Sequence, residues 1–418
     1  MNKDPDYSAA YIILQTNVPN LEGHGLTFTI GRGNEICCMA LEALVPLILN
    51  KDLRDITEDW GKFWKYVTGD SQLRWLGPDK GAVHLATGAI VNALWDLYAK
   101  AENKPLWRLL ADLSPSQLVK CIDFTYLSDV LQPNEALQIL EKLESTKAER
   151  IQHLEENGYP AYTTSAGWLG YPDEKIRHLC REAIKEGWTH IKMKVGSDIE
   201  DDMRRAAIIR EEIGYDRQLM MDANQKWEVD ESITYIKRLA IYKPLWIEEP
   251  TSPDDILGHA KIKEAIAPIK VATGEHCQNR VMFKQFISAG ALDICQIDSC
   301  RVGGLNENLA IMLIAAKYNI PVCPHAGGVG LCEYVQHLSY LDFISISGDM
   351  NGRMIEYVDH LHDHFKDPVN VKNGKYWVPE LPGFSIEMKE ATLKDFEFVS
   401  GSVWNKLKNE NPIPVVMK

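Results

Sequence analysis

The stretch "HIKMKVG", residues 190–196, decides the fold that we expect for this chain. Apolar side chains at every second position alternate with Lys192 and Lys194, and a period of two is the signal of a β-strand. The alternation places both lysines on one face, about 6.6 Å apart at the usual rise of about 3.3 Å per residue. Two neighbouring ammonium groups repel each other, so their position side by side needs a chemical reason.

The same pattern recurs from residue 159 onward, where a short apolar strand ends in polar residues and a helical stretch follows. Eight segments are strand candidates: "PAYTTSAG", "HIKMKVG", "LMMDAN", "LWIEEP", "KVATGEH", "DICQIDS", "IPVCPHAG" and "FISISG". Eight strands alternating with helices predict an α/β fold with a closed parallel barrel. A doubly wound open sheet is the alternative, but no GxGxxG turn follows a strand.

Three regions differ in pattern and predict the domain organisation. Residues 1–158 contain a strand pair, "SAAYIILQTN" and "GLTFTIGRG", followed by helical stretches, and this is typical of an α+β domain. Residues 159–370 form the predicted barrel. Residues 371–418 contain no further barrel unit, and we expect them to pack back on the N-terminal domain.

Charge and cysteine content exclude several classes of protein. The net charge of −14 makes nucleic acid and anionic membrane surfaces poor partners. The nine cysteines include no CxxC pair, which favours reduced, buried thiols in an intracellular compartment. The sequence contains no run of 18 apolar residues, so it predicts no transmembrane helix. The first ten residues lack the apolar core of a secretory signal.

Titratable residues lie at the ends of the predicted strands, and from Lys194 onward each is 23 to 28 positions from the next. They are Lys192 and Lys194, then Asp222, Glu248, Glu275, Asp298 and His325. Each alone has an ordinary structural explanation, such as a helix cap or a buried, hydrogen-bonded histidine. In successive units of a barrel, whose chemistry lies at the carboxyl ends of the strands, we expect them to meet in one site. Because buried charge is costly, such a ring requires a metal or a substrate.

The three carboxylates Asp222, Glu248 and Glu275 predict a metal site. They come from adjacent strands and offer only hard oxygen ligands, which suit Mg²⁺ rather than Zn²⁺. Mg²⁺ keeps open positions that a substrate carboxylate could fill. The metal would then stabilise negative charge that develops on that carboxylate.

The lysines and the histidine predict proton transfer. Burial and the mutual repulsion of Lys192 and Lys194 are expected to lower a lysine pKa, so that one amine acts as a neutral base and the other holds a substrate carboxylate. Asp298 can hydrogen-bond His325 and fix its tautomer. Strand seven is three steps from strand two in a ring of eight. We therefore expect the base to remove an α-proton on one side of the substrate, and His325 to protonate a departing hydroxide on the other.

Six short motifs occur in the order of a known family: "KMK", "MMDAN", "WIEEP", "ATGEH", "QIDSC" and "PHAGG". The chain resembles the enolase superfamily, mandelate racemase branch. Longer segments such as "YTTSAGWLGYPDE" and "CPHAGGVGLCE" resemble the L-fuconate dehydratases and their vertebrate mitochondrial relatives. The resemblance implies a modified TIM barrel, (β/α)₇β, with its first strand near "PAYTTSAGW". It also implies an N-terminal α+β capping domain completed by C-terminal residues.

The resemblance also implies roles for individual residues. Mg²⁺ would bind Asp222, Glu248 and Glu275. The catalytic residues would be the base Lys194 with its partner Lys192, and the acid His325, which Asp298 orients. Substrate contacts would come from Lys192, Asn224 and Glu356 and, in the capping domain, from Tyr7 and Trp75. In the family a further strand and a mobile glycine-rich loop precede the "DPDYSAAY" segment. We therefore expect that this part of the cap is missing from the printed sequence.

The activity implied by the resemblance is dehydration of a sugar acid. L-Fuconate would lose its α-proton, pass through an Mg²⁺-stabilised enediolate and lose the 3-hydroxyl, giving 2-keto-3-deoxy-L-fuconate and water. A small-molecule sugar acid, a homo-oligomer and a mitochondrial or otherwise cytoplasmic location are expected. Two alternatives stay open: a racemase or epimerase of a 2-hydroxy acid, and a metal-binding barrel without turnover.

Overall fold

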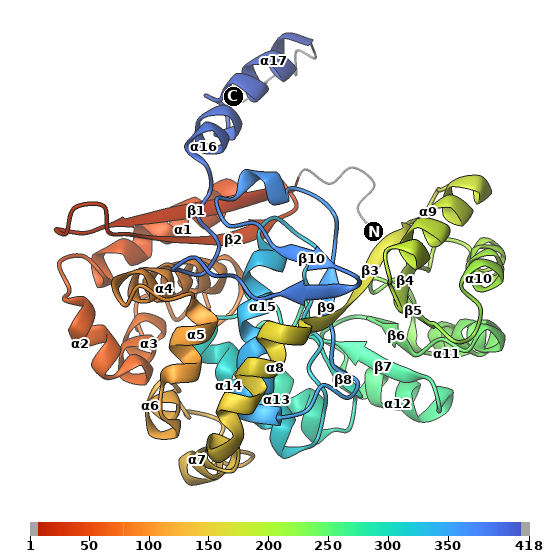
Figure 1. The fold of residues 1–418 in the computed structure, drawn as a ribbon, viewed down its shortest axis with the longest axis horizontal. Coiled ribbons are helices and arrows are strands. Elements are labelled where there is room, and N and C mark those ends of the chain that lie inside the picture. Colours follow the sequence, from red (N-terminus) through yellow and green to blue (C-terminus); the bar gives the residue numbers. More distant parts are fainter. Residues whose placement is uncertain (1–6, 78, 411–418) are drawn as a thin grey trace.

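The computed structural model describes residues 7–77 and 79–410, and its N-terminal region is a cap built on an antiparallel strand pair (Figure 1). Strands β1 (Ser8–Gln15) and β2 (Glu22–Thr29) pair over their whole length. They lie on the long helix α4 (Gly81–Ala101). A Cβ atom at Gly25 would lie 2.2 Å from the carbonyl oxygen of Ala89, so a glycine is needed where β2 crosses the helix.

Seven further helices complete the cap in the described residues, and the first four of them contact α4. They are α1 (Asn34–Leu44), α2 (Leu53–Glu58), α3 (Trp60–Thr68), α5 (Leu106–Asp112), α6 (Pro115–Lys120), α7 (Pro133–Glu141) and α8 (Lys147–Asn157), with 3₁₀ turns at Val45–Leu47 and Glu144–Thr146. Stacked Trp60 and Trp95 rings, with centroids 4.2 Å apart, join α3 to α4. The predicted α+β character of the N-terminal region is confirmed.

Parallel strands form the barrel. They are β3 (Tyr159–Gly167), β4 (His190–Lys194), β5 (Gln218–Asp222), β6 (Trp246–Glu248), β7 (Lys270–Thr273), β8 (Ile294–Cys295) and β9 (Ile355–Tyr357). Neighbours pair in chain order from β3 to β8, and β9 pairs with the other edge of β3. The predicted segment "IPVCPHAG" follows β8 and contributes one parallel bridge, between Cys295 and Val322. All these strands end on the same side.

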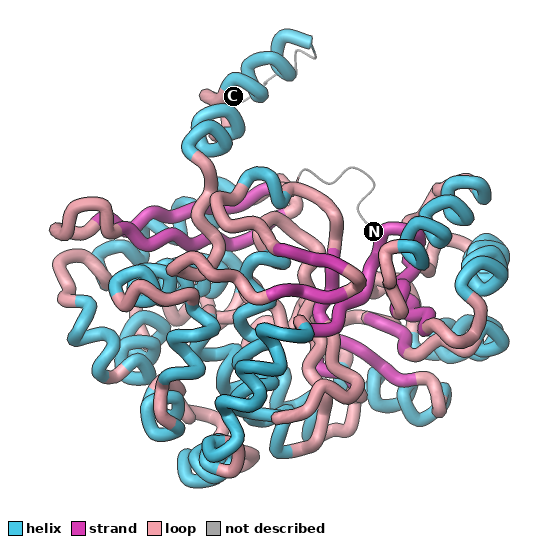
Figure 2. Tube along the Cα trace, viewed as in Figure 1, coloured by secondary structure: helices cyan, strands magenta, loops and turns pink. Residues whose placement is uncertain are grey.

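Helices cover the outside of these strands (Figure 2). They are α9 (Asp173–Lys185), α10 (Ile199–Ile213), α11 (Val229–Leu239, continued by a 3₁₀ turn at Ala240–Tyr242), α12 (Ile256–Ile266), α13 (Arg280–Ser288), α14 (Leu305–Lys317) and α15 (Leu331–Leu341). In the described residues these seven helices follow the first seven strand positions, and β9 is followed by none. This is the (β/α)₇β arrangement. Helix α14 is apolar nearly all round because it packs against both the barrel and the cap helices α3, α4 and α7.

One strand prediction is wrong. The segment "FISISG", residues 343–348, continues α15 as a π-helical stretch, Asp342–Ser347. The last barrel strand is β9, which begins seven positions after this segment ends and carries Glu356. Phe343, Ile344 and Ile346 are buried on all sides, and a short, fully buried apolar run has no period that distinguishes a helix from a strand.

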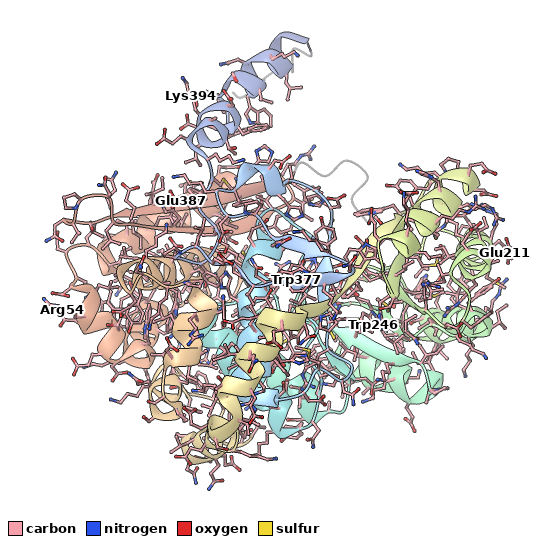
Figure 3. All side chains as sticks on the ribbon, viewed as in Figure 1. Arg54, Glu211, Trp246, Trp377, Glu387 and Lys394 are labelled. Atoms are coloured by element: carbon pink, nitrogen blue, oxygen red, sulfur yellow. The ribbon has the colours of Figure 1, made fainter. Side chains whose placement is uncertain are left out.

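The C-terminal residues connect the barrel to the cap. Strand β11 (Lys375–Trp377) pairs with β10 (Asn370–Lys372) and with β3. The chain then reaches the cap, where Glu387 Oε2 lies 2.7 Å from Lys100 Nζ and Met388 N–H donates to the hydroxyl of Tyr11. Figure 3 shows Glu387 near the cap strands and Lys394 further out, on helix α16 (Glu390–Phe396). Helix α17 (Ser402–Glu410) extends beyond it (Figure 1).

Two further expectations concern composition. All nine cysteines are free, and only Cys38 is exposed. Within the described part of the chain, no helix combines the length and the apolar character that crossing a membrane requires. Residues 1–6, which include most of the "DPDY" segment, lie outside the described residues.

Candidate active site

Three buried carboxylates meet where β5, β6 and β7 end. Asp222 and Glu248 are the last residues of β5 and β6 and are paired in register. Glu275 lies two residues beyond β7, after Gly274. Gly274 has a φ of +143°, and a Cβ atom there would lie 2.4 Å from the carbonyl oxygen of Gln296, so a glycine is needed. One oxygen from each carboxylate lies within 4.8 Å of the others.

The properties of this carboxylate cluster fit a hard divalent cation. Burial and neighbouring carboxylates raise the pKa of Glu248 well above its ordinary value, although Lys192 opposes them. In addition, Asn224 Oδ1 and Glu249 Oε2 are buried without a hydrogen-bond partner in the described residues. Oxygen ligands with excess negative charge are the donor set that Mg²⁺ prefers. The three carboxylates are therefore able to hold such an ion.

Both lysines of the opening stretch touch the cluster. Lys192 Nζ lies 2.7 Å from Glu248 Oε1 and 2.7 Å from Glu356 Oε1, and its side chain is 1 % exposed. Lys194 forms an ion pair with Asp222. Its Nζ also lies 5.7 Å from the centroid of the Trp168 ring.

The expected lowering of the lysine pKa is wrong for these contacts. Burial favours the neutral amines, but Glu248 and Glu356 beside Lys192, and Asp222 beside Lys194, outweigh it and raise both pKa values. Lysine–lysine repulsion is weaker than attraction to these closer carboxylates. The prediction from sequence considered the like charges and left the carboxylates out.

His325 lies against the other end of the cluster. Its Nδ1 is 2.8 Å from Asp298 Oδ2, and its Nε2 is 3.7 Å from Glu275 Oε2. Although burial lowers it, Glu275 and the hydrogen bond to Asp298 raise the pKa of His325 to about 10. A protonated imidazole at neutral pH is suited to act as a general acid.

A cavity of about 450 Å³ lies over these groups, between the cap and the barrel. Of the residues expected in the site, Tyr7, Lys194, Asn224, Glu275, Asp298, His325 and Glu356 line it. Asp222, Glu248 and Lys192 are buried beneath this lining. Trp75 is 98 % exposed and is not among the lining residues. The structure thus gathers the expected residues except Trp75.

Some lining residues were not expected from the sequence. Trp168 follows β3, His276 follows Glu275, and Arg301 donates from Nε to the carbonyl oxygen of Glu275 at 3.2 Å. Their positions just after barrel strands were the signal that could have identified them. Phe28 and Leu85 reach the cavity from the cap, and no pattern in the sequence marks them.

Comparison with known proteins agrees with this architecture. The family described as mandelate racemase / muconate lactonizing enzyme, N-terminal domain, matches residues 6–111. The family described as enolase C-terminal domain-like matches residues 175–392, more than half of the chain. The chain belongs to the enolase superfamily. The predicted family membership and fold class are therefore confirmed.

Individual relatives within the superfamily cover nearly the whole chain. The crystal structure of human mitochondrial enolase superfamily member 1 is 55 % identical, covers 97 % of this chain and 92 % of that chain, and has a TM-score of 0.95. L-Galactonate dehydratase of Hypocrea jecorina is 53 % identical over 403 residues, which are 95 % of this chain and 89 % of that protein.

A more distant relative shares the fold. L-Talarate dehydratase from Polaromonas sp. JS666, solved with Mg and L-glucarate, is 23 % identical. The match covers 92 % of this chain and 94 % of that chain, with a TM-score of 0.68. The superfamily relatives of this chain thus include sugar acid dehydratases.

Proposed function

We propose that this protein is an Mg²⁺-dependent sugar acid dehydratase that converts L-fuconate to 2-keto-3-deoxy-L-fuconate and water. One observation carries the proposal. The buried carboxylate cluster has an amine, Lys194, against Asp222 at one end and an aspartate-held imidazole, His325, near Glu275 at the other. Elimination of water needs a base and an acid on different sides of the substrate, and this arrangement offers both.

Each residue has a defined task in this proposal. Lys194 Nζ removes the α-proton, and His325 Nε2 gives a proton to the departing 3-hydroxyl. Asp298 accepts from His325 Nδ1, and this directs Nε2 to the substrate. The backbone N of Gly327 lies 3.2 Å from Nε2 and has to move aside when that nitrogen carries the proton.

Asp222, Glu248 and Glu275 would hold Mg²⁺, which would supply positive charge to stabilise the negative charge that develops on the substrate carboxylate. Asp222 raises the pKa of Lys194 in this structure. As a metal ligand it would attract the lysine less strongly, and Lys194 could then lose its proton and act as the base.

The remaining expected residues bind and shape the substrate. Asn224 and Glu356 line the cavity next to these groups, and we propose that they contact substrate hydroxyls. Lys192 holds Glu248 and Glu356 together, and its proposed contact with the substrate carboxylate requires one of these ion pairs to loosen. Tyr7 closes the cavity from the cap, where its ring stacks on His360 with centroids 4.9 Å apart.

The cap side of the cavity supports the choice of L-fuconate. Phe28, Ile30 and Leu85 give this side an apolar wall. Because the carboxylate end of the substrate faces the barrel groups, its far end reaches this wall. The methyl group of L-fuconate suits such a wall better than the terminal hydroxyl of L-galactonate, and an apolar pocket discriminates against an added hydroxyl by at most about 100-fold.

The test is 2-keto acid formation from a panel of sugar acids with Mg²⁺, L-fuconate and L-galactonate included. Higher kcat/KM on L-fuconate supports the proposal. Turnover of L-galactonate with none of L-fuconate rejects the substrate and keeps the reaction class. Change of configuration without 2-keto acid would instead identify an epimerase, which the same pair of proton-transfer groups could also support.

Location and assembly complete the proposal. The name of the human relative supports a mitochondrial location for this chain, which fractionation of cells that express the untagged protein would test. We also propose a homo-oligomer. Light scattering coupled to gel filtration would contradict this if it gave the mass of one 47.3 kDa chain.

A further inference from the structure

A second row of polar side chains lies beside the buried carboxylate cluster. Gln225, Glu249 and His276 follow the ends of β5, β6 and β7, the same strands that supply the carboxylates. Gln225 donates from Nε2 to Glu249 Oε1 at 2.9 Å, and His276 Nδ1 lies 2.7 Å from the same oxygen. We call these three residues the outer row, and Glu249 is its centre.

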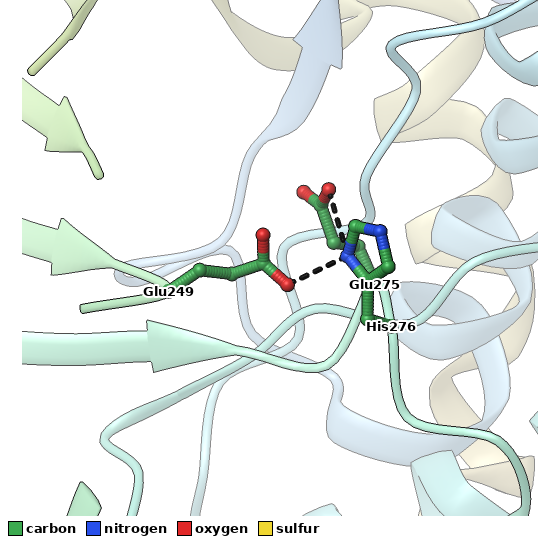
Figure 4. A group of neighbouring side chains, drawn as sticks. All are labelled: Glu249, Glu275 and His276. Atoms are coloured by element: carbon green, nitrogen blue, oxygen red, sulfur yellow. Dashed lines mark hydrogen bonds and ion pairs between the residues drawn. The ribbon is translucent and has the colours of Figure 1, made fainter. Parts of the chain in front are cut away.

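The outer row touches the cluster at one point. His276 Nδ1 also lies 3.3 Å from Glu275 Oε1, so the imidazole bridges two carboxylates from neighbouring strands (Figure 4). The shorter contact is with Glu249, which therefore fixes the ring. The ring then meets Glu275 with its orientation already set.

Glu275 needs this support more than the other two carboxylates do. Asp222 and Glu248 lie within strands that pair in register, and lysines hold both of them. Glu275 lies on the turn beyond β7. Within the described residues its side-chain partners are two histidines, His276 at 3.3 Å and His325 at 3.7 Å.

The outer row is costly to maintain. Glu249 is fully buried, and its φ of +42° lies in the left-handed region that a glutamate rarely adopts. Gln225 has a φ of +62°, and its N–H donates to the carbonyl oxygen of Glu249 at 2.8 Å. A buried carboxylate and a strained backbone persist only where the surrounding structure enforces them, and such strain gathers at functional sites.

We propose that His276, held by Glu249, is a positioning residue that fixes the carboxylate of Glu275 for Mg²⁺ binding. This inference rests on the proposed function, because it takes the carboxylate cluster as the metal site. Groups that orient metal ligands through hydrogen bonds typically change metal affinity by about 10- to 100-fold when they are removed. His276 therefore acts on the affinity for the metal rather than on proton transfer.

The experiment compares the Mg²⁺ affinity of full-length variants by isothermal titration calorimetry. His276→Leu removes the bridging nitrogen and should weaken Mg²⁺ binding about 10- to 100-fold. His276→Asn places an amide donor near the position of Nδ1 and should restore most of the affinity. His178→Leu makes the same change on the exposed outer face of α9 and should leave the affinity unchanged.

Thermal unfolding without metal separates positioning from a general loss of structure. His276→Leu and His276→Asn should unfold at similar temperatures yet differ in Mg²⁺ affinity. Wild-type affinity in His276→Leu overturns the inference and leaves the metal site intact. If the wild-type protein itself does not bind Mg²⁺, the proposed metal site and this inference are both overturned.

Glu249→Gln gives a second route if His276→Leu does not fold. This change keeps the size of the side chain and removes its charge, and it should weaken Mg²⁺ binding, as His276→Leu does. Because Glu249 acts through His276, adding Glu249→Gln to His276→Asn should lower the Mg²⁺ affinity further. Where His276→Leu does fold, adding Glu249→Gln to it should leave the Mg²⁺ affinity unchanged. Independent, additive losses in the two backgrounds would contradict the proposed path.

Discussion

The Nδ1 atom of His325 lies 2.8 Å from Oδ2 of Asp298. The other oxygen of Asp298 accepts the backbone N–H groups of Cys300 and Arg301, at 2.7 and 2.8 Å. Asp298 therefore cannot turn away without breaking these bonds, and His325 is held with Nε2 toward Glu275. An imidazole fixed through Nδ1 can donate a proton from Nε2 to a leaving group, once Nε2 no longer accepts the backbone N–H of Gly327 at 3.2 Å.

His325→Asn should separate the two proton transfers. The variant keeps a polar side chain but has no proton to donate, so 2-keto acid formation should fall by about 10²- to 10⁴-fold. Exchange of the α-proton in D₂O, which depends on Lys194, should continue. An unchanged dehydration rate would remove His325 from the mechanism.

Lys194→Ala should abolish both reactions. Without the amine beside Asp222, neither α-proton exchange nor dehydration should proceed, each falling by about 10²- to 10⁴-fold. Mg²⁺ should still bind, since all three carboxylates remain. NMR of α-proton exchange and a measurement of Mg²⁺ affinity on the same sample check the loss of exchange and the retained metal binding. Exchange at the wild-type rate in the variant would reject Lys194 as the base.

Removal of divalent cations should stop turnover and lower stability. A chelator should abolish 2-keto acid formation, and added Mg²⁺ should restore it. Because a ligand that binds only the folded state stabilises it, 100-fold excess over Kd should raise the free energy of unfolding by about 2.7 kcal/mol. A melting temperature independent of Mg²⁺, together with activity in the chelator, would contradict a metal site.

Glu307 should stabilise the contact between cap and barrel. It lies between His84 of α4, at 2.6 Å, and Arg280 of α13, at 3.2 Å, and all three are buried. Although burial raises it, these two neighbours, His84 first, lower the pKa of Glu307 to about 2. Glu307→Gln should reduce the free energy of unfolding by about 3 kcal/mol at pH 7, the lower end for breaking a buried ion pair, because Arg280 keeps a contact with Asp123 at 3.4 Å.

The pH dependence of this effect follows from the direction of the shift. A carboxyl whose pKa is lowered by folding stabilises the protein fully above its unfolded pKa, about 4.5, and loses that effect as the pH falls toward 2. The difference between wild type and Glu307→Gln in urea unfolding should therefore be smaller at pH 3 than at pH 7. Glu141→Gln, on the exposed face of α7, is the matched control. An equal difference at both pH values would contradict the assignment.

Tyr7 and Trp75 should differ in their effect on substrate binding. Tyr7→Phe keeps the ring that stacks on His360 and removes the hydroxyl, so KM should rise about 2- to 10-fold, the value of one hydrogen bond. Trp75→Ala should leave KM unchanged, because that side chain is 98 % exposed. A large increase of KM in Trp75→Ala would show instead that the cap closes further and brings Trp75 to the substrate.

The site could be predicted from the sequence because a βα unit has a simple geometry. Each unit brings the carboxyl end of its strand to the same side, so Asp222, Glu248 and Glu275 had to meet once the strands were recognised. The same rule placed Asp298 next to His325. It failed for "FISISG", where a fully buried run carries no period.

The amino-acid sequence by itself thus determined the barrel and the identity of the polar groups at the strand ends, since these depend on local periodicity and spacing, and the resemblance of its motifs indicated the family. Only the tertiary structure decided the charge of Lys194, the exposure of Trp75 and the bridge from Glu249 through His276 to Glu275. These features depend on distances between side chains from different strands or domains. Electrostatic and hydrogen-bond energies change steeply over an ångström or two, and spacing along the chain does not specify such distances.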